Sequence, residues 1–295
     1  QPGRRADTVI PSAHTGGSAL AISQDSKTLV SGGWSGFVRL WDLKSGRGLG
    51  KWQAHSDSVN GIYFLDDERF LTAGYDGLIA IWNRDGDRID NRKTGKITAA
   101  TVDLEQDLLL TGHKDGTVTR WQLSKLEELA RYQAHNGLVR SVAINNRGDQ
   151  FASSGTDTRV ALIDPVAGRI QHLPGPPSDP RSLAFSPDDS YLIGGGWFKL
   201  FRWQLDNGNL AVLDTAHRGI INHIQFTPDG TLASISRQTD SAVLLLDPAD
   251  GSTRDRLQQH DLCGVAVEVS PDGRFLATTS DDASVRIWSF DDLNR

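Results

Sequence analysis

Five histidines recur along the chain, and imidazole is the side chain best suited to acid–base chemistry or metal binding near neutral pH. These histidines are His14, His55, His135, His217 and His260. Aspartates follow several of them at a similar distance, so a metal or acid–base site is one interpretation. The histidines, however, lie about 41 residues apart, or twice that, which assigns one to each repeated unit instead of gathering them in one site. The spacing favours a structural role.

Other candidate chemistry is weaker. His113, His172 and His223 show no ligand spacing with one another, and Cys263 fits a small apolar strand position. Residues 83–87 (Asn-Arg-Asp-Gly-Asp) begin like a calcium loop but lack the later glutamate, so a hairpin turn is favoured. The chain contains neither a Gly-x-Ser-x-Gly nucleophile motif nor a phosphate-binding loop. We therefore expect no catalytic residues, metal or cofactor.

Tryptophan marks the repeat that positions the histidines. Stretches of alternating apolar residues end at Trp41, Trp82, Trp121, Trp203 and Trp288, and Ile163 and Leu246 occupy the two missing positions. The seven units share a period of about 41 residues. Alternation is clear at 77–82 and 284–288, and a period of two indicates β-strand.

Units of four short strands can bury their apolar faces only by stacking against neighbours, and closing the stack into a ring removes most exposed edges. The expected fold is all-β: a seven-bladed propeller with four antiparallel strands per blade. The last unit, residues 260–289, supplies only three strands. We expect residues 7–10 to provide the fourth by pairing with residues 284–288, which closes the ring. This predicts one propeller at 6–290, with a flexible tail at 1–5 and a second tail at 291–295.

The units resemble the WD-repeat family, from the opening histidine to the closing Trp41-Asp42. The resemblance covers about residues 6–290 and implies a buried hydrogen-bonded tetrad of histidine, Ser/Thr, aspartate and tryptophan in each blade. The most complete sets are His55, Thr72, Asp76 and Trp82, and His260, Thr278, Asp282 and Trp288. Elsewhere the set is incomplete, as where Ser35 replaces the aspartate and Lys93 the histidine. The fifth unit has Pro176 at the histidine position and Trp197 near the aspartate position.

The resemblance also implies a non-catalytic scaffold that binds a protein or peptide through loops on one face. The positions that face the partner are Trp34, Tyr75, Lys96, Lys114, Arg140, Arg181 and Trp197. This set is basic and aromatic, so we expect an acidic contact surface on the partner. Two alternatives remain: an accessory propeller of a larger signalling, redox or transport-related protein, and a site for a small anion at the channel mouth.

Composition limits the partners further. The chain has 31 Lys and Arg against 37 Asp and Glu, a net charge of −6, which argues against nucleic acid. A single cysteine excludes an internal disulfide, and no apolar stretch approaches a membrane span, so no membrane insertion is expected. We expect a monomeric propeller. The chain contains no methionine, so the initiator is missing, and both a cytoplasmic and a periplasmic or secreted location remain open.

Overall fold

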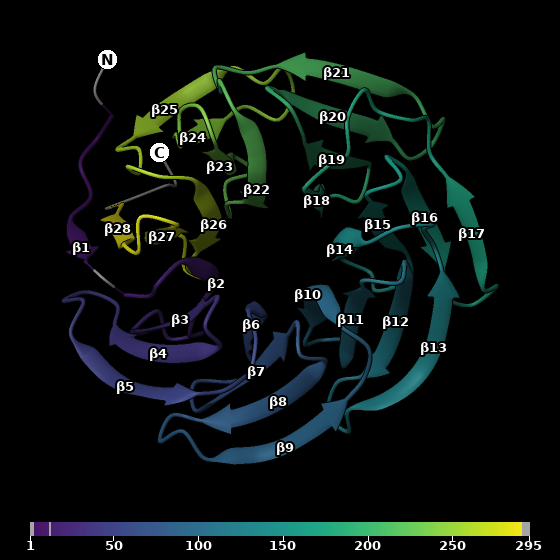
Figure 1. Ribbon diagram of the computed structural model, residues 1–295. Helices are drawn as coiled ribbons and strands as arrows, with labels where there is room; N and C mark the ends of the chain where they lie inside the picture. Colours follow the sequence, from purple (N-terminus) through teal and green to yellow (C-terminus); the bar gives the residue numbers. More distant parts are fainter. Residues whose placement is uncertain (1–2, 12, 291–295) are drawn as a thin grey trace.

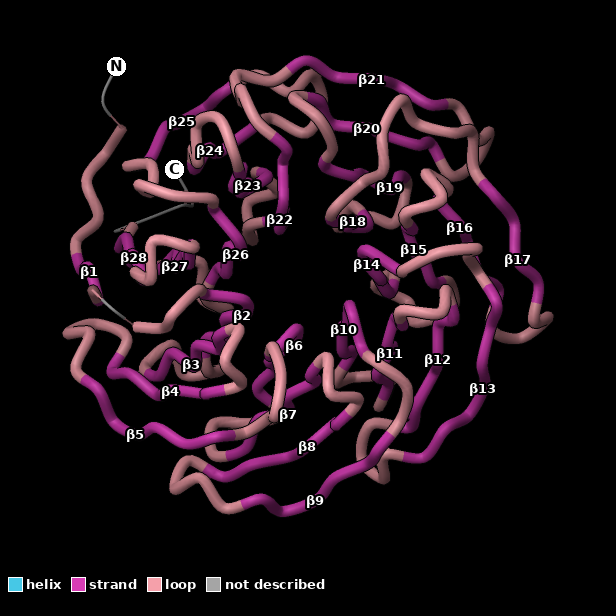
Figure 2. The backbone as a smooth tube through the Cα atoms, viewed as in Figure 1, coloured by secondary structure: helices cyan, strands magenta, loops and turns pink. Residues whose placement is uncertain are grey.

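The computed structural model describes residues 3–11 and 13–290. Seven four-stranded antiparallel sheets are arranged as blades around a central axis (Figure 1). Across these residues the backbone consists of strands and loops without a helix (Figure 2). The seven-bladed propeller predicted from the repeat is confirmed.

Each blade runs from an inner to an outer strand. Blades 1 and 2 consist of β2 (Gly17–Ile22), β3 (Thr28–Gly33), β4 (Phe37–Asp42) and β5 (Gly48–Gln53), and of β6 (Val59–Phe64), β7 (Arg69–Gly74), β8 (Leu78–Asn83) and β9 (Arg88–Lys93). Blades 3 and 4 consist of β10 (Ile97–Asp103), β11 (Leu108–His113), β12 (Thr117–Gln122) and β13 (Glu127–Gln133), and of β14 (Val139–Ile144), β15 (Phe151–Gly155), β16 (Val160–Asp164) and β17 (Arg169–His172). Blades 5 and 6 consist of β18 (Ser182–Phe185), β19 (Tyr191–Gly195), β20 (Lys199–Gln204) and β21 (Leu210–Asp214), and of β22 (Ile220–Phe226), β23 (Leu232–Arg237), β24 (Val243–Leu246) and β25 (Thr253–Leu257).

Blade 7 joins the two ends of the chain. It contains β26 (Gly264–Val269), β27 (Phe275–Ser280), β28 (Val285–Ser289) and, as its outer strand, β1 (Thr8–Ile10). The register pairs Thr8 with Ile287 and Ile10 with Val285, and β1 lies beside β28 in Figure 1. Closure of the ring by the N-terminal strand is therefore confirmed.

The segment predicted as an N-terminal tail also contacts the ring. The Arg4 amide donates to the Arg256 carbonyl at 2.8 Å, and the Gln258 amide donates to the Arg4 carbonyl at 2.8 Å. Arg4 is thus bonded on both sides to the end of β25, and the ordered contacts begin before residue 6. The predicted tail at 291–295 lies outside the described residues.

The core lies between neighbouring blades, because each sheet is covered on both faces. In one cluster Val30 and Leu40 of blade 1 pack with Ile62, Phe70 and Trp82 of blade 2. The Trp82 indole therefore packs between the two blades. The closing residue of each repeat contributes to the apolar layer between neighbouring blades in the same way. Fully burying a side chain of this kind stabilises the fold by roughly 1.5–3 kcal/mol.

A left-handed residue lies five positions before the closing residue of every repeat, in the turn between the second and third strands. These residues, with their φ angles, are Gly36 (78°), Gly77 (78°), Gly116 (87°), Thr158 (62°), Phe198 (60°), Ser241 (44°) and Ala283 (67°). At Gly77 a Cβ would lie 2.4 Å from the Thr94 carbonyl oxygen, so glycine is required there by space as well as by φ. The same count places Trp197 at the aspartate position of blade 5 and Gly196 before it.

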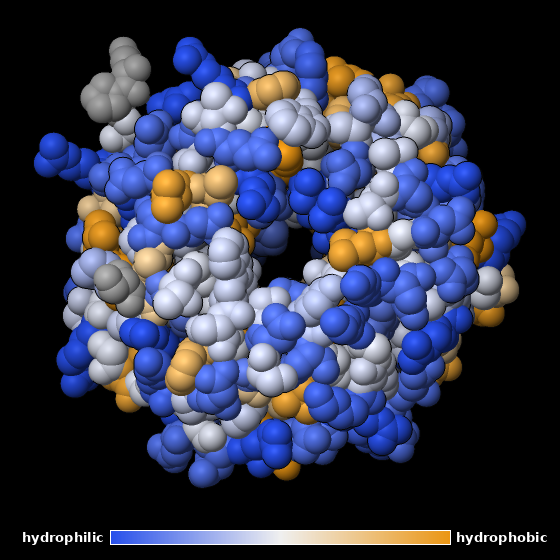
Figure 3. Space-filling model, in the orientation of Figure 1, coloured by the Kyte–Doolittle hydropathy of each residue, from blue (hydrophilic) through white to orange (hydrophobic). Residues whose placement is uncertain are grey.

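The seven inner strands surround a central channel of about 650 Å³, visible as the hollow in Figure 3. Side chains of one inner strand bond to the backbone of the next. The Asn60 amide donates to the Ile97 carbonyl at 2.8 Å, and the Thr98 hydroxyl donates to the Val139 carbonyl at 2.7 Å. Similar bonds join blade 4 to 5, blade 5 to 6 and blade 6 to 7. These bonds fix the inner ends of adjacent blades relative to one another.

Candidate partner-binding face

The predicted tetrad of blade 2 is formed. His55 Nδ1 lies 2.9 Å from Asp76 Oδ1 and His55 Nε2 lies 2.8 Å from Thr72 Oγ1, while the Trp82 indole donates to Thr72 Oγ1 at 2.9 Å. Because the Asp76 carboxylate can only accept, the imidazole proton lies on Nδ1. Nε2 of the neutral ring then accepts from the Thr72 hydroxyl, which itself accepts from the indole. Burial lowers the pKa of His55, and the bonds from His55 and the Ser56 and Leu78 amides lower the pKa of Asp76 although burial opposes this. This closed network is a structural device.

In blade 7 the tetrad differs from the prediction. His260 bonds to Asp282 at 3.0 Å and to Thr278 at 2.7 Å, as expected. The Trp288 indole, however, donates to the Arg4 carbonyl oxygen at 3.1 Å and not to Thr278, so the fourth contact was wrongly predicted. The physical reason is that the N-terminal segment supplies a backbone acceptor at this blade.

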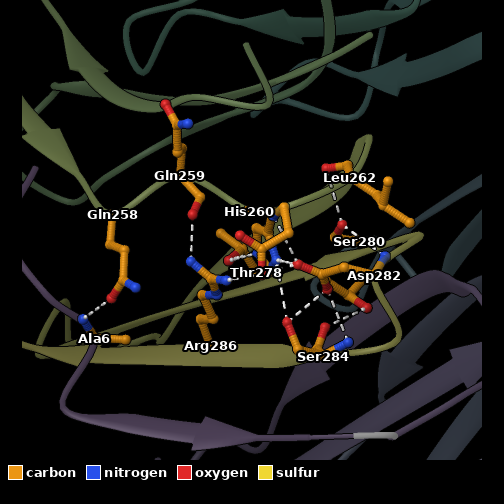
Figure 4. Close-up of polar contacts among 12 residues, drawn as sticks. Ala6, Gln258, Gln259, His260, Leu262, Thr278, Ser280, Asp282, Ser284 and Arg286 are labelled. Carbon is orange, nitrogen blue, oxygen red and sulfur yellow. Dashed lines mark hydrogen bonds and ion pairs between the residues drawn. The ribbon is translucent and has the colours of Figure 1, made fainter. Parts of the chain in front are cut away.

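A buried arginine also distinguishes this network. Arg286 pairs with Thr278 across the sheet, the position that Ala80 holds opposite Thr72 in blade 2. Its guanidinium donates to the Gln259 carbonyl and lies 3.6 Å from Asp282 Oδ2 (Figure 4). Asp282 therefore lies against both a histidine and an arginine. Hydrogen bonds from His260 and Ser284 hold its pKa far below the ordinary value, although burial opposes this.

Three other blades modify the set. In blade 3, where Lys93 replaces the usual histidine, His113 of β11 takes its place: its Nε2 lies 2.9 Å from Thr111 Oγ1, which accepts from the Trp121 indole. His113 was not predicted for this role; the signal is its position two residues after Thr111, which places both on one face of the strand. In blades 1 and 6 the Nδ1 atoms of His14 and His217 have no hydrogen-bond partner among the described residues. Burial consequently lowers the pKa of each to about 4.

Blade 5 has no tetrad. Its Trp203 indole donates to the Pro174 carbonyl at 2.9 Å, which replaces the missing hydroxyl. The turn that carries Trp197 and Phe198 stands where blades 2 and 3 have Asp-Gly. This blade is consequently free to present other side chains at that turn.

The predicted face residues do lie at one end of the blades. Trp34, Tyr75, Lys114 and Trp197 occupy equivalent turns between second and third strands, and Lys96, Arg140 and Arg181 lie at the starts of the inner strands that meet those turns. Trp34, Lys96, Lys114 and Trp197 are exposed, whereas Tyr75, Arg140 and Arg181 are half-buried. The Lys96 ammonium lies 4.8 Å from the centre of the Tyr75 ring, so these two act together.

Arg140 and Arg181 meet at the mouth of the channel, and both line it. Asp179 lies between them, 3.1 Å from Arg140 Nε and 3.8 Å from Arg181 Nε. Burial and the nearby charge of Arg140 lower the pKa of Arg181. Its Nε is buried without a hydrogen-bond acceptor, so the site holds positive charge that is only partly satisfied.

A third arginine, Arg237 at the end of β23, was missed because it lies outside the repeat positions considered. Its charge also acts on Arg181, and its Nη2 lies 3.9 Å from Asp281 Oδ2. Burial raises the pKa of Asp281, whose Oδ1 lacks a donor. Three arginines and two aspartates are thus linked by ion pairs and by charge, and two of the arginines line the channel. We call this set the arginine cluster: Arg140, Arg181, Arg237, Asp179 and Asp281.

Five stretches of the chain match the model of the family described as WD domain, G-beta repeat: residues 8–42, 46–83, 126–164, 168–203 and 251–289. Together they cover more than half of the chain. The chain belongs to the WD-repeat family. The unmatched stretches hold the second and third strands of blades 3 and 6, where the tetrad is altered. Each matched stretch begins in or next to the outer strand of one blade and ends in the third strand of the next.

Several proteins are similar to this WD-repeat chain. Autophagy-related protein 16 of Arabidopsis thaliana is 23% identical over 202 residues, which cover 65% of this chain and 40% of that protein. WD repeat-containing protein SL1-17 of Schistosoma mansoni is 28% identical over 62% of this chain and 62% of its own length. Telomerase protein component 1 of Rattus norvegicus is 25% identical over 90% of this chain and 10% of its own length. This chain therefore spans less than two thirds of these relatives.

WD-repeat propellers generally serve as non-catalytic scaffolds for protein contacts. Among residues 3–11 and 13–290, no group of three or more histidine, cysteine, aspartate or glutamate side chains is arranged to hold a metal ion. The same residues contain no helix with the length and apolar character needed to cross a membrane.

Proposed function

We propose that this propeller binds an acidic segment of a protein partner on the face that carries Trp34, Tyr75, Lys96, Lys114, Arg140, Arg181 and Trp197. The observation that supports this most strongly is the arginine cluster. Arg140 and Arg181 share one carboxylate, Asp179, while Arg237 pairs with Asp281, and buried Nε donors on Arg181 and Arg237 lack acceptors. A carboxylate from a partner would complete these bonds.

The frame of the propeller supports the same proposal. Arg140 and Arg181 are held at adjacent inner strands, and the hydroxyl of Ser141, next to Arg140, accepts the Leu183 amide at 3.0 Å. The two guanidinium groups are therefore positioned before a partner arrives, and little ordering entropy opposes binding.

The test uses random dodecapeptides displayed on phage and selected on the immobilised protein. The expected peptides are enriched in aspartate and glutamate, and those carried forward bind the Arg140→Gln/Arg181→Gln protein at least tenfold more weakly in fluorescence anisotropy. The stronger Arg140→Glu/Arg181→Glu change places a like charge beside Asp179, so its melting temperature is measured alongside. Peptides without acidic residues, or equal binding by the glutamine variant, would contradict the proposal.

A matched control keeps the change in charge but moves it elsewhere. Lys44 and Arg47 are exposed in the turn between β4 and β5, at the opposite end of the blade from Trp34. The Lys44→Gln/Arg47→Gln protein should bind the selected peptides as the wild type does. Weakening by both double variants would indicate a general charge effect.

The second candidate is a small anion at the channel mouth, because Arg140 and Arg181 line the channel itself. Inorganic phosphate distinguishes the two. Phosphate that binds at micromolar concentration, and whose binding is lost in the Arg140→Gln/Arg181→Gln protein, would favour the anion. Phosphate that weakens peptide binding no more than chloride does at equal ionic strength favours the peptide.

A further inference from the structure

We propose that Trp197 and Phe198 form the anchor of this face, and that they hold an apolar side chain of the acidic segment. The inference rests on the proposed function and names which contact gives it specificity. Blade 5 differs from the repeat at the turn between its second and third strands. Blades 2 and 3 carry Asp76-Gly77 and Asp115-Gly116 at this turn, and blade 5 carries Trp197-Phe198.

Phe198 adopts a conformation that its residue type disfavours. Its φ is 60°, in the left-handed region where a bulky side chain is an outlier and glycine is at ease. Three blades place glycine at this position, so the turn itself does not need an aromatic residue. Backbone strain of this kind concentrates at functional sites.

Both rings are also exposed. Trp197 is 42% and Phe198 41% accessible, and their ring centroids lie 5.5 Å apart at an interplanar angle of 60°. The fold thus places two adjacent large apolar side chains in water at a turn whose equivalents are small or polar. Aromatic side chains are enriched in the cores of protein interfaces, and tryptophan is among the residues that most often carry their binding energy.

The backbone beneath the rings is held firmly. The Trp197 amide donates to Ser178 Oγ at 3.3 Å, and the Phe198 amide donates to the Gly219 carbonyl at 3.2 Å. The Thr215 hydroxyl donates to the Phe198 carbonyl at 2.8 Å. The rings are therefore presented by a fixed turn, which favours a preformed site.

The surrounding charges indicate the occupant. The Arg181 amide bonds to the Gly195 carbonyl, two residues before Trp197, which places the arginine cluster next to the aromatic turn. On the other side Arg218 is exposed, next to the Gly219 that holds Phe198, and it makes no ion pair with a described residue. An apolar ring site between cations fits a peptide in which a leucine or aromatic side chain has an acidic neighbour.

The experiment uses the selected dodecapeptides and three variants. Trp197→Ala and Phe198→Gly should each weaken binding at least fivefold, and Phe198→Gly should not lower the melting temperature, because glycine relieves the left-handed strain. Ala283→Gly relieves the same φ in blade 7 and is the matched control, so its affinity should equal that of the wild type.

A direct readout comes from the Trp34→Phe protein. Among the described residues of this variant, Trp197 is the one exposed tryptophan. Bound peptide should protect its fluorescence from iodide quenching. Unchanged affinity in Trp197→Ala and unchanged quenching would overturn the anchor, and the Arg140→Gln/Arg181→Gln result would still report separately on the face. Binding of single-stranded oligo(dT) that is lost in Trp197→Ala would also overturn it, by assigning the rings to base stacking.

Discussion

The indole nitrogen of Trp288 donates a hydrogen bond to the carbonyl oxygen of Arg4, 3.1 Å away and 284 residues earlier in the chain. In blade 2 the equivalent indole bonds within its own blade. The closing residue of the last repeat thus depends on a residue near the start of the chain. Together with β1, this contact makes the two ends of the chain one structural unit.

Removal of residues 1–12 should therefore lower the melting temperature markedly, because it exposes the β28 edge and leaves the buried Trp288 indole without its acceptor. Thermal unfolding followed by circular dichroism measures the change. An unchanged curve would contradict closure through β1.

Two neighbours in β1 provide a finer test. Ile10 is 5% exposed and packs in the core beside blade 1, whereas Val9 is 48% exposed. Ile10→Ser should lower the free energy of unfolding by about 3 kcal/mol, and Val9→Ser by less than about 1 kcal/mol. Equal losses in urea denaturation would mean that β1 is not packed as described.

Asp76→Ala should destabilise the protein by roughly 3–5 kcal/mol, because His55 loses its buried acceptor and the Ser56 amide loses its own. Asp115 is the matched control. Its carboxylate bonds to Thr117 and makes no hydrogen bond to His113, so Asp115→Ala should cost only about 1 kcal/mol. A loss below about 0.5 kcal/mol for Asp76→Ala would contradict the tetrad.

The ring and the tetrad of blade 2 could be predicted from sequence because both follow from a period. Trp82, Asp76, Thr72 and His55 keep their spacing, and the empty place beside β28 could be filled only by residues 7–10. Contacts between distant parts of the chain have no such signal. The Trp288 indole donates to the backbone carbonyl of Arg4, and every residue type has the same backbone carbonyl, so the sequence contains no signal for this contact.

The candidate face was predicted in part. The turn positions followed from the repeat, but the pairing of Arg140 with Asp179 depends on side-chain directions that spacing does not give. Arg237 was missed because two extra residues shift the turn of blade 6. Phe198 could have been found by counting five residues back from Trp203, a position where the repeat expects glycine.

Lowering the pH from 6.5 toward 4 should weaken the fold through two buried histidines. The pKa of His14 is lowered to about 4 by burial and by the charge of Arg39, and that of His217 to about 4 by burial, against 6.5 when unfolded. Below pH 6.5 the unfolded chain takes up protons that the folded chain refuses, so stability falls as the pH drops from 6.5 toward 4. Each histidine contributes up to roughly 1.4 kcal/mol per pH unit. Urea denaturation at pH 7, 6 and 5 measures the slope of the free energy of unfolding against pH. His14→Gln should reduce this slope by the contribution of one proton, and an unaltered slope would contradict the prediction.

Glu268 should give the stability the opposite dependence on pH. It lines the channel, and burial raises its pKa to about 8, although the Ile22 backbone and the Gln225 side chain oppose this. A raised carboxyl pKa contributes stability at pH below 4.5 that is lost as the pH rises toward 8. Glu268→Gln should therefore change little at pH 5 and stabilise by about 2 kcal/mol at pH 8, a figure reduced because water reaches the channel. Equal effects at the two pH values would contradict the neutral carboxyl.

The pairing of β1 with β28 has a mechanical consequence. The strands are antiparallel, and the Thr8–Ile287 pair lies nearest to both ends of the chain, with Ile10–Val285 farthest from them. Tension applied between the two ends would load the β1–β28 hydrogen bonds from one side and break the pairs one after another. This geometry resists less force than one in which the two strands slide past each other and all the pairs break at once. The bonds that join Arg4 to the end of β25 would also be loaded, and blades 1 to 5 would bear no load until this seam had opened. Under tension, the propeller should therefore open first between β1 and β28, where the two ends of the chain close the ring.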